Sequence, residues 1–200
     1  MLIQLFYGQI DLPTTLFWLV GLVIAITFHE AAHAYLADLL GDKTPRYMGR
    51  LTLDPLAHLD PIGTLLILLA GFGWGRPVQF NPLALKNPTL GAAVISLAGP
   101  TTNFVLAILF SLLIHLHVAP THLWYQIVYV NILLGVFNLI PIAPLDGEKI
   151  FAAFLSPAMR EQWRDVQQYG IFLLLIVVLT LGAPLSALVK AIVAFLTGQI

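Results

Sequence analysis

The segment of residues 90–117 contains no aspartate, glutamate, lysine or arginine. A helix needs about twenty mostly apolar residues to cross the hydrocarbon core of a bilayer, and this segment is long enough to do so. Apolar residues make up 59% of the chain and charged residues 10%, whereas a typical soluble protein is about half apolar and about a quarter charged. A chain of this composition cannot cover itself with polar surface, so we expect an integral membrane protein.

Other apolar segments are candidate membrane helices as well. Residues 13–40 begin with a proline, which favours the first turn of a helix, and they are followed by Gly41. Residues 123–140 form another candidate span. Residues 170–181 and 185–196 are separated by Gly-Ala-Pro, so they form either two short helices or one broken span.

The chain between the first and second spans has a different character. Residues 42–61 are polar and rich in proline, a pattern that predicts extended segments and turns rather than helix. Residues 62–74 are apolar but too short for a span, which favours a re-entrant insertion followed by a short extended piece at 75–82. We therefore predict an all-α polytopic membrane protein with about five to six transmembrane helices and a short re-entrant, β-like insertion after the first span.

The whole chain, residues 1–200, is predicted to be a single integral membrane domain. Its core covers about residues 14–150, and further helices follow at about 151–200. Residues 1–11 lack the basic region and cleavage site of a signal peptide, so we expect the first apolar segment to remain in the mature protein. The chain has no cysteine, which excludes disulfides and thiolate sites.

Basic residues gather in two parts of the chain. They follow the first span and the 123–140 span, whereas the connection at 118–122 has none. These basic residues are Lys43, Arg46, Arg50, Arg76 and Lys86, and then Lys149, Arg160 and Arg164. The excess of basic residues in cytoplasmic loops places segments 41–90 and 145–168 on the cytoplasmic side of the cell membrane.

The first span contains the sequence His-Glu-Ala-Ala-His, which begins at His29. An ionisable side chain inside a span is costly, so it suggests a function. His29 and His33 are four residues apart, which puts both imidazoles on one face of a helix, and Glu30 lies beside them. In zinc hydrolases this pattern supplies two metal ligands and a glutamate that takes a proton from the attacking water. The alternative is a buried polar cluster that joins helices.

A catalytic zinc usually has three protein ligands, so one more ligand must come from another part of the chain. Asp146 is the best candidate because the predicted topology brings it to the same side of the membrane as the two histidines. Pro141 and Pro144 disrupt the helix before it, and Gly147 loosens the backbone after it.

Two further stretches accompany the histidine motif. They are Ser-Leu-Ala-Gly-Pro-Thr-Thr-Asn-Phe at 96–104 and Asn-Leu-Ile-Pro-Ile-Ala-Pro-Leu-Asp-Gly at 138–147. Together the three motifs resemble the site-2 protease family of intramembrane zinc metalloproteases. Segments 49–64 and 75–82 are similar to its compact subgroup, which has no PDZ or CBS domains, and the resemblance covers about residues 17–151.

The resemblance implies one zinc ion, with His29, His33 and Asp146 as its ligands and Glu30 as the general base. It also implies a role near the substrate for Asn138, whose amide would bind the substrate strand or the developing oxyanion. The alternative for Asn138 is a hydrogen bond between helices.

Two other polar residues receive structural interpretations from the sequence. Asn103 lies in a stretch of small residues where helices pack closely. His58 lies between two Asp-Pro turns, and we expect it to stabilise a turn or face solvent rather than line the site.

The function implied is hydrolysis of peptide bonds in transmembrane substrate proteins, within or near the bilayer, as in regulated intramembrane proteolysis. The expected partners are a membrane protein substrate and lipid, and no basic run suggests nucleic acid. A zinc-binding membrane transporter or an inactive membrane scaffold is the alternative. Glu30 favours the hydrolase, because a transporter has no particular need for a glutamate beside its first histidine ligand.

Overall fold

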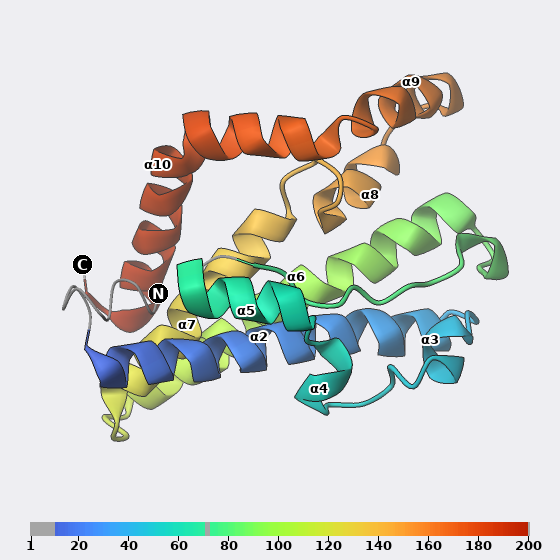
Figure 1. The fold of residues 1–200 in the computed structure, drawn as a ribbon. Coiled ribbons are helices and arrows are strands. Elements are labelled where there is room, and N and C mark those ends of the chain that lie inside the picture. The colour runs from blue at the N-terminus through green and yellow to red at the C-terminus, as the bar shows by residue number, and fades with distance from the viewer. Residues whose placement is uncertain (1–10, 71–72, 200) are drawn as a thin grey trace.

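The computed structural model describes residues 11–70 and 73–199, and Figure 1 shows their arrangement. This described part of the chain is helical, without a β-strand, and its one β-type pairing is an isolated bridge between Leu59 and Gly75. The expectation of no signal peptide concerned residues 1–11, and of these residues 1–10 lie outside the described part of the chain. The predicted all-α class is therefore confirmed for the described residues.

Two long helices form where the sequence predicted the first and second spans. α2 (Leu12–Leu39) begins after Asp11, whose carboxylate accepts a backbone N–H of the first turn. α6 (Pro88–His115) begins in the same way after Asn87. Such caps satisfy backbone donors that have no partner at a helix start. Each helix has 28 residues and is long and apolar enough to cross a membrane.

α10 (Gly170–Thr197) is the third helix of the described chain that meets this requirement. It is one continuous helix, so the C-terminal apolar residues form one bent helix rather than two short ones. Figure 1 shows the bend, and Pro184 inside the helix accounts for it because proline removes a backbone donor and crowds the preceding turn.

α7 (Thr121–Asn138) lies within the bundle and packs against α2, α6 and α10. Its 18 residues fit the predicted segment, but it is not among the helices apolar enough to count as a candidate span. Gly21 allows α2 to approach α7 closely, because a Cβ at Gly21 would be 3.1 Å from the Cα of Ile127 on α7. A buried apolar cluster then joins α6, α7 and α10 through Ala107, Val128, Ile132, Val189 and Val193.

The segment after α2 differs from its prediction. We expected extended chain and turns, and the structure has two short helices, α3 (Thr44–Tyr47) and α4 (Pro55–His58). Each has proline in its first turn, where the missing N–H costs nothing. Asp54 caps α4 by accepting the N–H of Leu56. The Asp-Pro pair that suggested a turn is also the cap and first residue of a helix.

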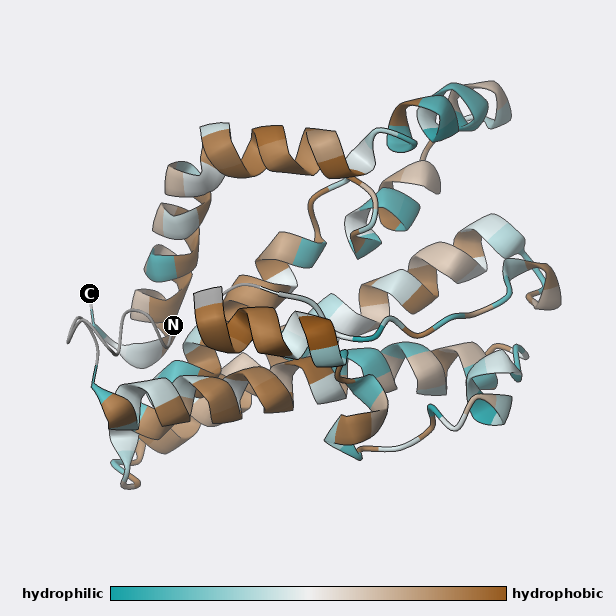
Figure 2. Cartoon of the chain, in the orientation of Figure 1, coloured by the Kyte–Doolittle hydropathy of each residue, from teal (hydrophilic) through white to brown (hydrophobic). Residues whose placement is uncertain are grey.

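α5 (Pro61–Ala70) is the apolar segment for which we predicted a re-entrant insertion, and Figure 2 shows it as strongly hydrophobic. Ten residues at about 1.5 Å each make a helix about 15 Å long, roughly half the thickness of the hydrocarbon core. The chain then returns without regular structure over residues 73–81 to a 3-10 turn, η1 (Pro82–Ala84).

The basic segment at 145–168 forms two helices, α8 (Asp146–Ala152) and α9 (Pro157–Gln167). Ser156 caps α9 and a proline starts it, so a new helix begins there.

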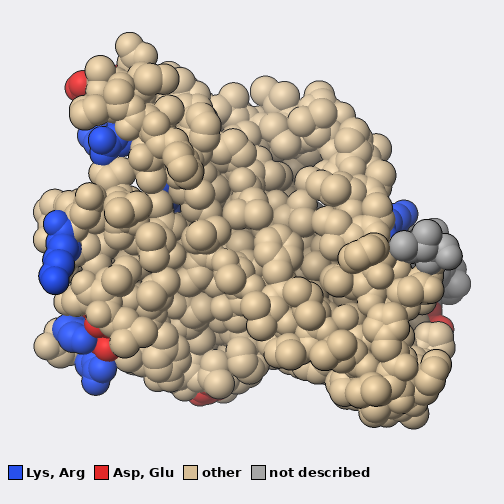
Figure 3. All heavy atoms as spheres, turned by 180° about the vertical axis from the view of Figure 1, so that it is seen from behind, with Lys and Arg blue, Asp and Glu red and all other residues tan. Residues whose placement is uncertain are grey.

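Most of the charge visible in Figure 3 lies at one end of the molecule. This end carries α3, α9 and the start of α6, whereas the turn between α6 and α7 lies at the other end (Figure 1). The two basic segments of the sequence therefore come together at one end of the bundle, as the topology predicted.

Candidate metal centre

His29 and His33 lie one turn apart on α2 and are 4% and 6% exposed. Their ring centroids are 4.6 Å apart, with the ring planes nearly perpendicular. The predicted pair therefore shares one buried face of the helix, directed into the bundle.

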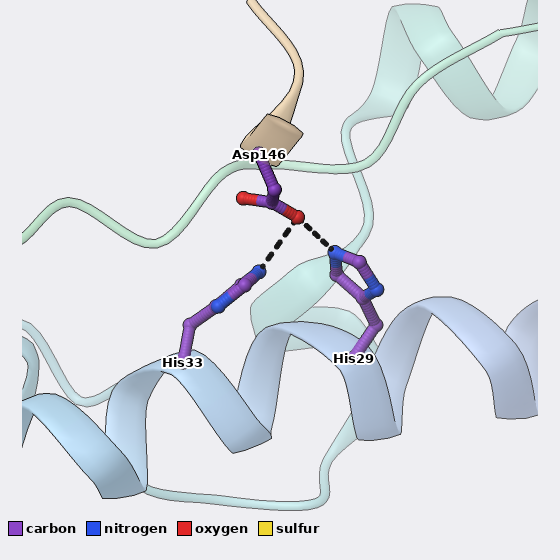
Figure 4. A group of neighbouring side chains, drawn as sticks. All are labelled: His29, His33 and Asp146. Atoms are coloured by element: carbon purple, nitrogen blue, oxygen red, sulfur yellow. Dashed lines mark hydrogen bonds and ion pairs between the residues drawn. The ribbon is translucent and has the colours of Figure 1, made fainter. Parts of the chain in front are cut away.

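Asp146, the first residue of α8, faces this pair (Figure 4). Its Oδ2 atom lies 3.0 Å from Nε2 of His29 and 3.3 Å from Nε2 of His33. Within the described ranges, these three side chains are the one group of histidine and acidic residues whose ligand atoms gather closely enough for a metal ion. The structure thus brings Asp146 to two histidines from which more than a hundred positions of the sequence separate it.

Gly147 permits this approach. A Cβ at this position would lie 2.4 Å from the carbonyl oxygens of Leu139 and Ile140, so α8 begins in direct contact with the end of α7. From the sequence we expected the glycine to loosen the backbone, and the structure shows that its function is close packing instead. The contact holds Asp146 over α2.

Gly99 allows α6 to pack closely against the two histidines. A Cβ on Gly99 would lie 2.6 Å from Nε2 of His29 and 2.6 Å from Nε2 of His33. The α6 backbone therefore approaches the two imidazole nitrogens without a side chain between them. Any larger residue at this position would collide with the candidate ligand atoms.

The remaining ring nitrogens have fixed partners. Nδ1 of His29 lies 2.6 Å from Oδ1 of Asn103, and Nδ1 of His33 lies 2.7 Å from the carbonyl oxygen of Ile95. Metal-binding histidines usually donate their second N–H to such acceptors, which orients the ring. Asn103 therefore contacts a site residue, a role that the sequence did not reveal because an asparagine in an apolar helix has no distinctive spacing.

The donor set fits a cation. A neutral imidazole carries one N–H, yet each of the two rings faces an acceptor at both nitrogens. A cation between the Nε2 atoms and the carboxylate removes this conflict. Zinc bound tetrahedrally at about 2.0–2.1 Å would separate its ligand atoms by about 3.3 Å, and the two distances to Asp146 are 3.0 and 3.3 Å.

Glu30 is held by the chain that follows α5. Its Oε2 accepts the backbone N–H of Val78 at 2.8 Å, and its charge acts on both His33 and Arg50. Its carboxylate is therefore close to the predicted ligands and fixed in direction.

Arg50 fixes that chain in turn. Its guanidinium donates to the backbone carbonyls of Ala57, Arg76 and Pro77, and the residue is 3% exposed. Burial lowers the pKa of Arg50, and the nearby Glu30 carboxylate partly opposes this effect. The basic side chain thus joins the segment after α3 to the segment that contacts Glu30.

Asn138 and His58 lie outside the ligand cluster. Asn138 is half-buried at the end of α7, where its amide donates to the carbonyl oxygen of Leu134 at 3.0 Å. His58 is fully buried, and its Nε2 bonds the carbonyl oxygen of Thr52 at 2.9 Å. This contact agrees with the turn-stabilising alternative for His58 and excludes the solvent-facing one.

Comparison with known proteins gives matches that share one description. The model of peptidase family M50 matches residues 115–181. "Putative zinc metalloprotease YwhC" of Bacillus subtilis is 39% identical over 176 residues, which are 80% of this chain and 79% of that protein. "Putative zinc metalloprotease Rip2" of Mycobacterium tuberculosis is 31% identical over 80% of this chain and 65% of that protein. "Zinc metalloprotease MJ0392" of Methanocaldococcus jannaschii is 27% identical over 74% and 38%.

No solved structure matches the chain significantly. The Bacillus protein is similar over most of both chains, and the family model matches this chain as well. The chain belongs to peptidase family M50, the family of the site-2 proteases.

Proposed function

We propose that this protein is an intramembrane zinc metalloprotease that hydrolyses peptide bonds of transmembrane proteins within or near the bilayer. One observation carries the proposal. Nε2 of His29, Nε2 of His33 and Oδ2 of Asp146 converge in the interior of an apolar helix bundle, and Glu30 is the residue next to His29. Membership in peptidase family M50 and the names of the relatives support the same reaction.

His29, His33 and Asp146 would hold the zinc ion, with Nδ1 of each histidine kept as the donor to a fixed acceptor. When bound, zinc supplies Lewis acidity, which polarises the scissile carbonyl and acidifies water. Gly99 lets α6 pack closely against the two imidazole rings, because it puts no side chain against the two Nε2 atoms.

Glu30 is proposed as the general base. Its carboxylate would accept a proton from the attacking water and deliver that proton to the leaving amine. The Val78 N–H holds Oε2 and so restricts the rotation of the carboxylate. A base held in one direction needs no reorientation at the moment of proton transfer.

Asn138 is proposed to contact the substrate. In the present structure its amide caps a carbonyl of its own helix, one turn back at Leu134. It is half-buried at the end of α7, on the segment that leads to Asp146. A side-chain amide there can turn to bond an extended substrate strand or an oxyanion.

In the membrane we propose about five to six spanning helices, with α5 as a re-entrant insertion that enters and leaves at the end carrying most of the charge. That end is proposed to face the cytoplasm of the cell that carries the protein in its plasma membrane, because basic residues favour this side. The site then opens toward the cytoplasm, which supplies the water that lipid excludes.

A zinc transporter or an inactive scaffold is less well supported. A transport path needs ligands at several depths of the bilayer, whereas the described residues gather potential metal ligands at one point. A glutamate fixed beside that point serves hydrolysis rather than passage of an ion.

The test is cleavage of a single-span substrate by the purified protein in liposomes. Wild type should cleave, and Glu30→Gln and chelator-treated protein should not. Glu161→Gln, on the exposed face of α9, is the matched control and should retain activity. Cleavage by Glu30→Gln at the rate of wild type would refute the mechanism.

A further inference from the structure

We infer that Asn131 is a positioning residue for the metal centre, because it fixes the tautomer and orientation of His29 through Asn103. The inference rests on the proposed metal-binding function of His29. Asn131 lies on α7 and touches neither the three candidate ligands nor Glu30 by any hydrogen bond found in the described chain. Its effect on the site must therefore pass through another side chain.

Three side chains form a continuous buried hydrogen-bond chain. Nδ2 of Asn131 donates to the carbonyl oxygen of Ile127 at 2.8 Å, and Oδ1 of Asn131 accepts from Nδ2 of Asn103 at 2.9 Å. Oδ1 of Asn103 then faces Nδ1 of His29 at 2.6 Å. Both asparagines are 0% exposed, so water cannot replace any of these partners without opening the bundle.

The hydrogen-bond chain has a fixed direction from donor to acceptor. A backbone carbonyl can only accept, so the atom of Asn131 that faces Ile127 must be its NH₂ group. Its oxygen is then the atom that faces Asn103, and this oxygen requires the NH₂ group of Asn103 on that side. The same NH₂ group donates to the carbonyl oxygen of Ala25 at 3.1 Å, which uses its second hydrogen.

The oxygen of Asn103 is therefore left for His29, and it can accept only if Nδ1 of His29 carries the proton. A neutral His29 with its proton on Nδ1 has a free electron pair on Nε2, the atom that lies 3.0 Å from Asp146. In this way two backbone carbonyls, on α2 and α7, determine which nitrogen of a candidate ligand is available to a metal ion.

His33 provides an internal comparison. Its Nδ1 bonds the carbonyl oxygen of Ile95 directly, with no side chain between them. Loss of Asn131 should therefore affect His29 and leave His33 unchanged. A role of Asn131 limited to joining α6 and α7 would not distinguish the two histidines.

The first experiment measures zinc affinity of Asn131→Leu and Asn131→Ala by competition with a chelator. Loss of an outer-shell partner of a metal ligand commonly weakens binding by about 10- to 100-fold, and we expect a loss in this range, with cleavage restored by excess zinc. Ser111→Ala is the control, because its buried hydroxyl donates to the carbonyl oxygen of Ile108 on its own helix and has no other hydrogen bond among the described residues. Unchanged zinc affinity in both Asn131 variants would overturn the inference.

The second experiment begins with wild type, so its first result does not depend on the folding of a variant. In zinc-loaded wild type with ¹⁵N-labelled histidine, NMR should show a proton on Nδ1 of His29 and on Nδ1 of His33. In Asn131→Ala the His29 signal should shift and the His33 signal should stay. A wild-type His29 without a proton on Nδ1 would overturn the inference whatever the variants do. A wild type that binds no zinc would instead refute the proposed function.

Discussion

The backbone N–H of Val78 donates a 2.8 Å hydrogen bond to Oε2 of Glu30. This bond attaches the chain after α5 to the proposed general base, across 48 positions of the sequence. Arg50 supports the same chain by donating to the carbonyl oxygens of Arg76 and Pro77. The direction of the Glu30 carboxylate thus depends on a backbone segment that Arg50 holds in place.

Arg50→Leu should reduce cleavage much more than it reduces zinc affinity. The change removes the donor to the carbonyl oxygens of Ala57, Arg76 and Pro77, and hydrogen bonds from a charged group contribute about 1.5–3 kcal/mol each. The released chain no longer fixes Glu30, whereas the three candidate ligands keep their supports on α2, α6 and α8. Parallel measurement of cleavage rate and zinc affinity checks this.

Arg76→Gln is the matched control for this prediction. Its side chain is exposed and its backbone contacts remain after the substitution. It should cleave at nearly the wild-type rate. Equal losses of cleavage and zinc affinity in Arg50→Leu would mean that Arg50 supports the whole fold rather than the base.

Gly99→Ala should weaken zinc binding while the fold is retained. The new methyl group would lie 2.6 Å from Nε2 of both His29 and His33, so the rings must turn away from each other or from Asp146. Overpacking of this kind costs about 1–3 kcal/mol, and here the cost falls on the atoms that bind the ion. Gly182→Ala, with nothing within 4 Å of the added methyl group, should bind zinc normally. Normal zinc affinity in Gly99→Ala would contradict this prediction, because it would mean that the added methyl group does not displace the imidazole rings.

Some parts of this site were readable from the sequence because their signals are local. His29 and His33 are four residues apart, so their spacing alone places both imidazoles on one face of the helix, with Glu30 next to His29 in the sequence. The prediction of Asp146 as a ligand required the topology as well. The basic segments indicated that the chain around Asp146 lies on the same side of the membrane as the histidines.

Other parts had no local signal. Asn103 and Asn131 are asparagines in largely apolar helices, and only the packing of α2, α6 and α7 makes them neighbours. The contact of Val78 with Glu30 uses the backbone N–H, which every residue except proline possesses, so no residue type announces it. The helix at Pro55 was missed because Asp-Pro begins turns and helices alike.

Gly147→Ala should impair both stability and zinc binding. Its methyl group would lie 2.4 Å from two backbone carbonyl oxygens at the end of α7, and backbone cannot move aside as a side chain can. α8 must then shift and take Asp146 away from the histidines. Thermal unfolding and zinc affinity measured together check this, and a variant with normal values for both would contradict the close packing.

Asp42 should make stability depend on pH in the acid range. Its buried carboxylate would have a raised pKa from burial alone, but hydrogen bonds from Thr44 and from the N–H of Asn81 outweigh burial and lower the pKa below 3.8. A lowered pKa in the folded state means that the ionised carboxylate stabilises the fold. This contribution is complete above the ordinary aspartate pKa and disappears as the pH falls through the lower folded value.

Asp42→Asn removes this contribution, because an amide offers one acceptor atom where the carboxylate offers two. The difference in Tm between wild type and Asp42→Asn should therefore be largest at neutral pH and shrink as the pH falls below about 4. Asp165→Asn, on the exposed face of α9, should show no such pH-dependent difference. Thermal unfolding in detergent from pH 7 to pH 3 measures all three proteins. If the difference stays constant over that range, the Asp42 carboxylate does not join the start of α3 to Asn81 in the way its hydrogen bonds indicate.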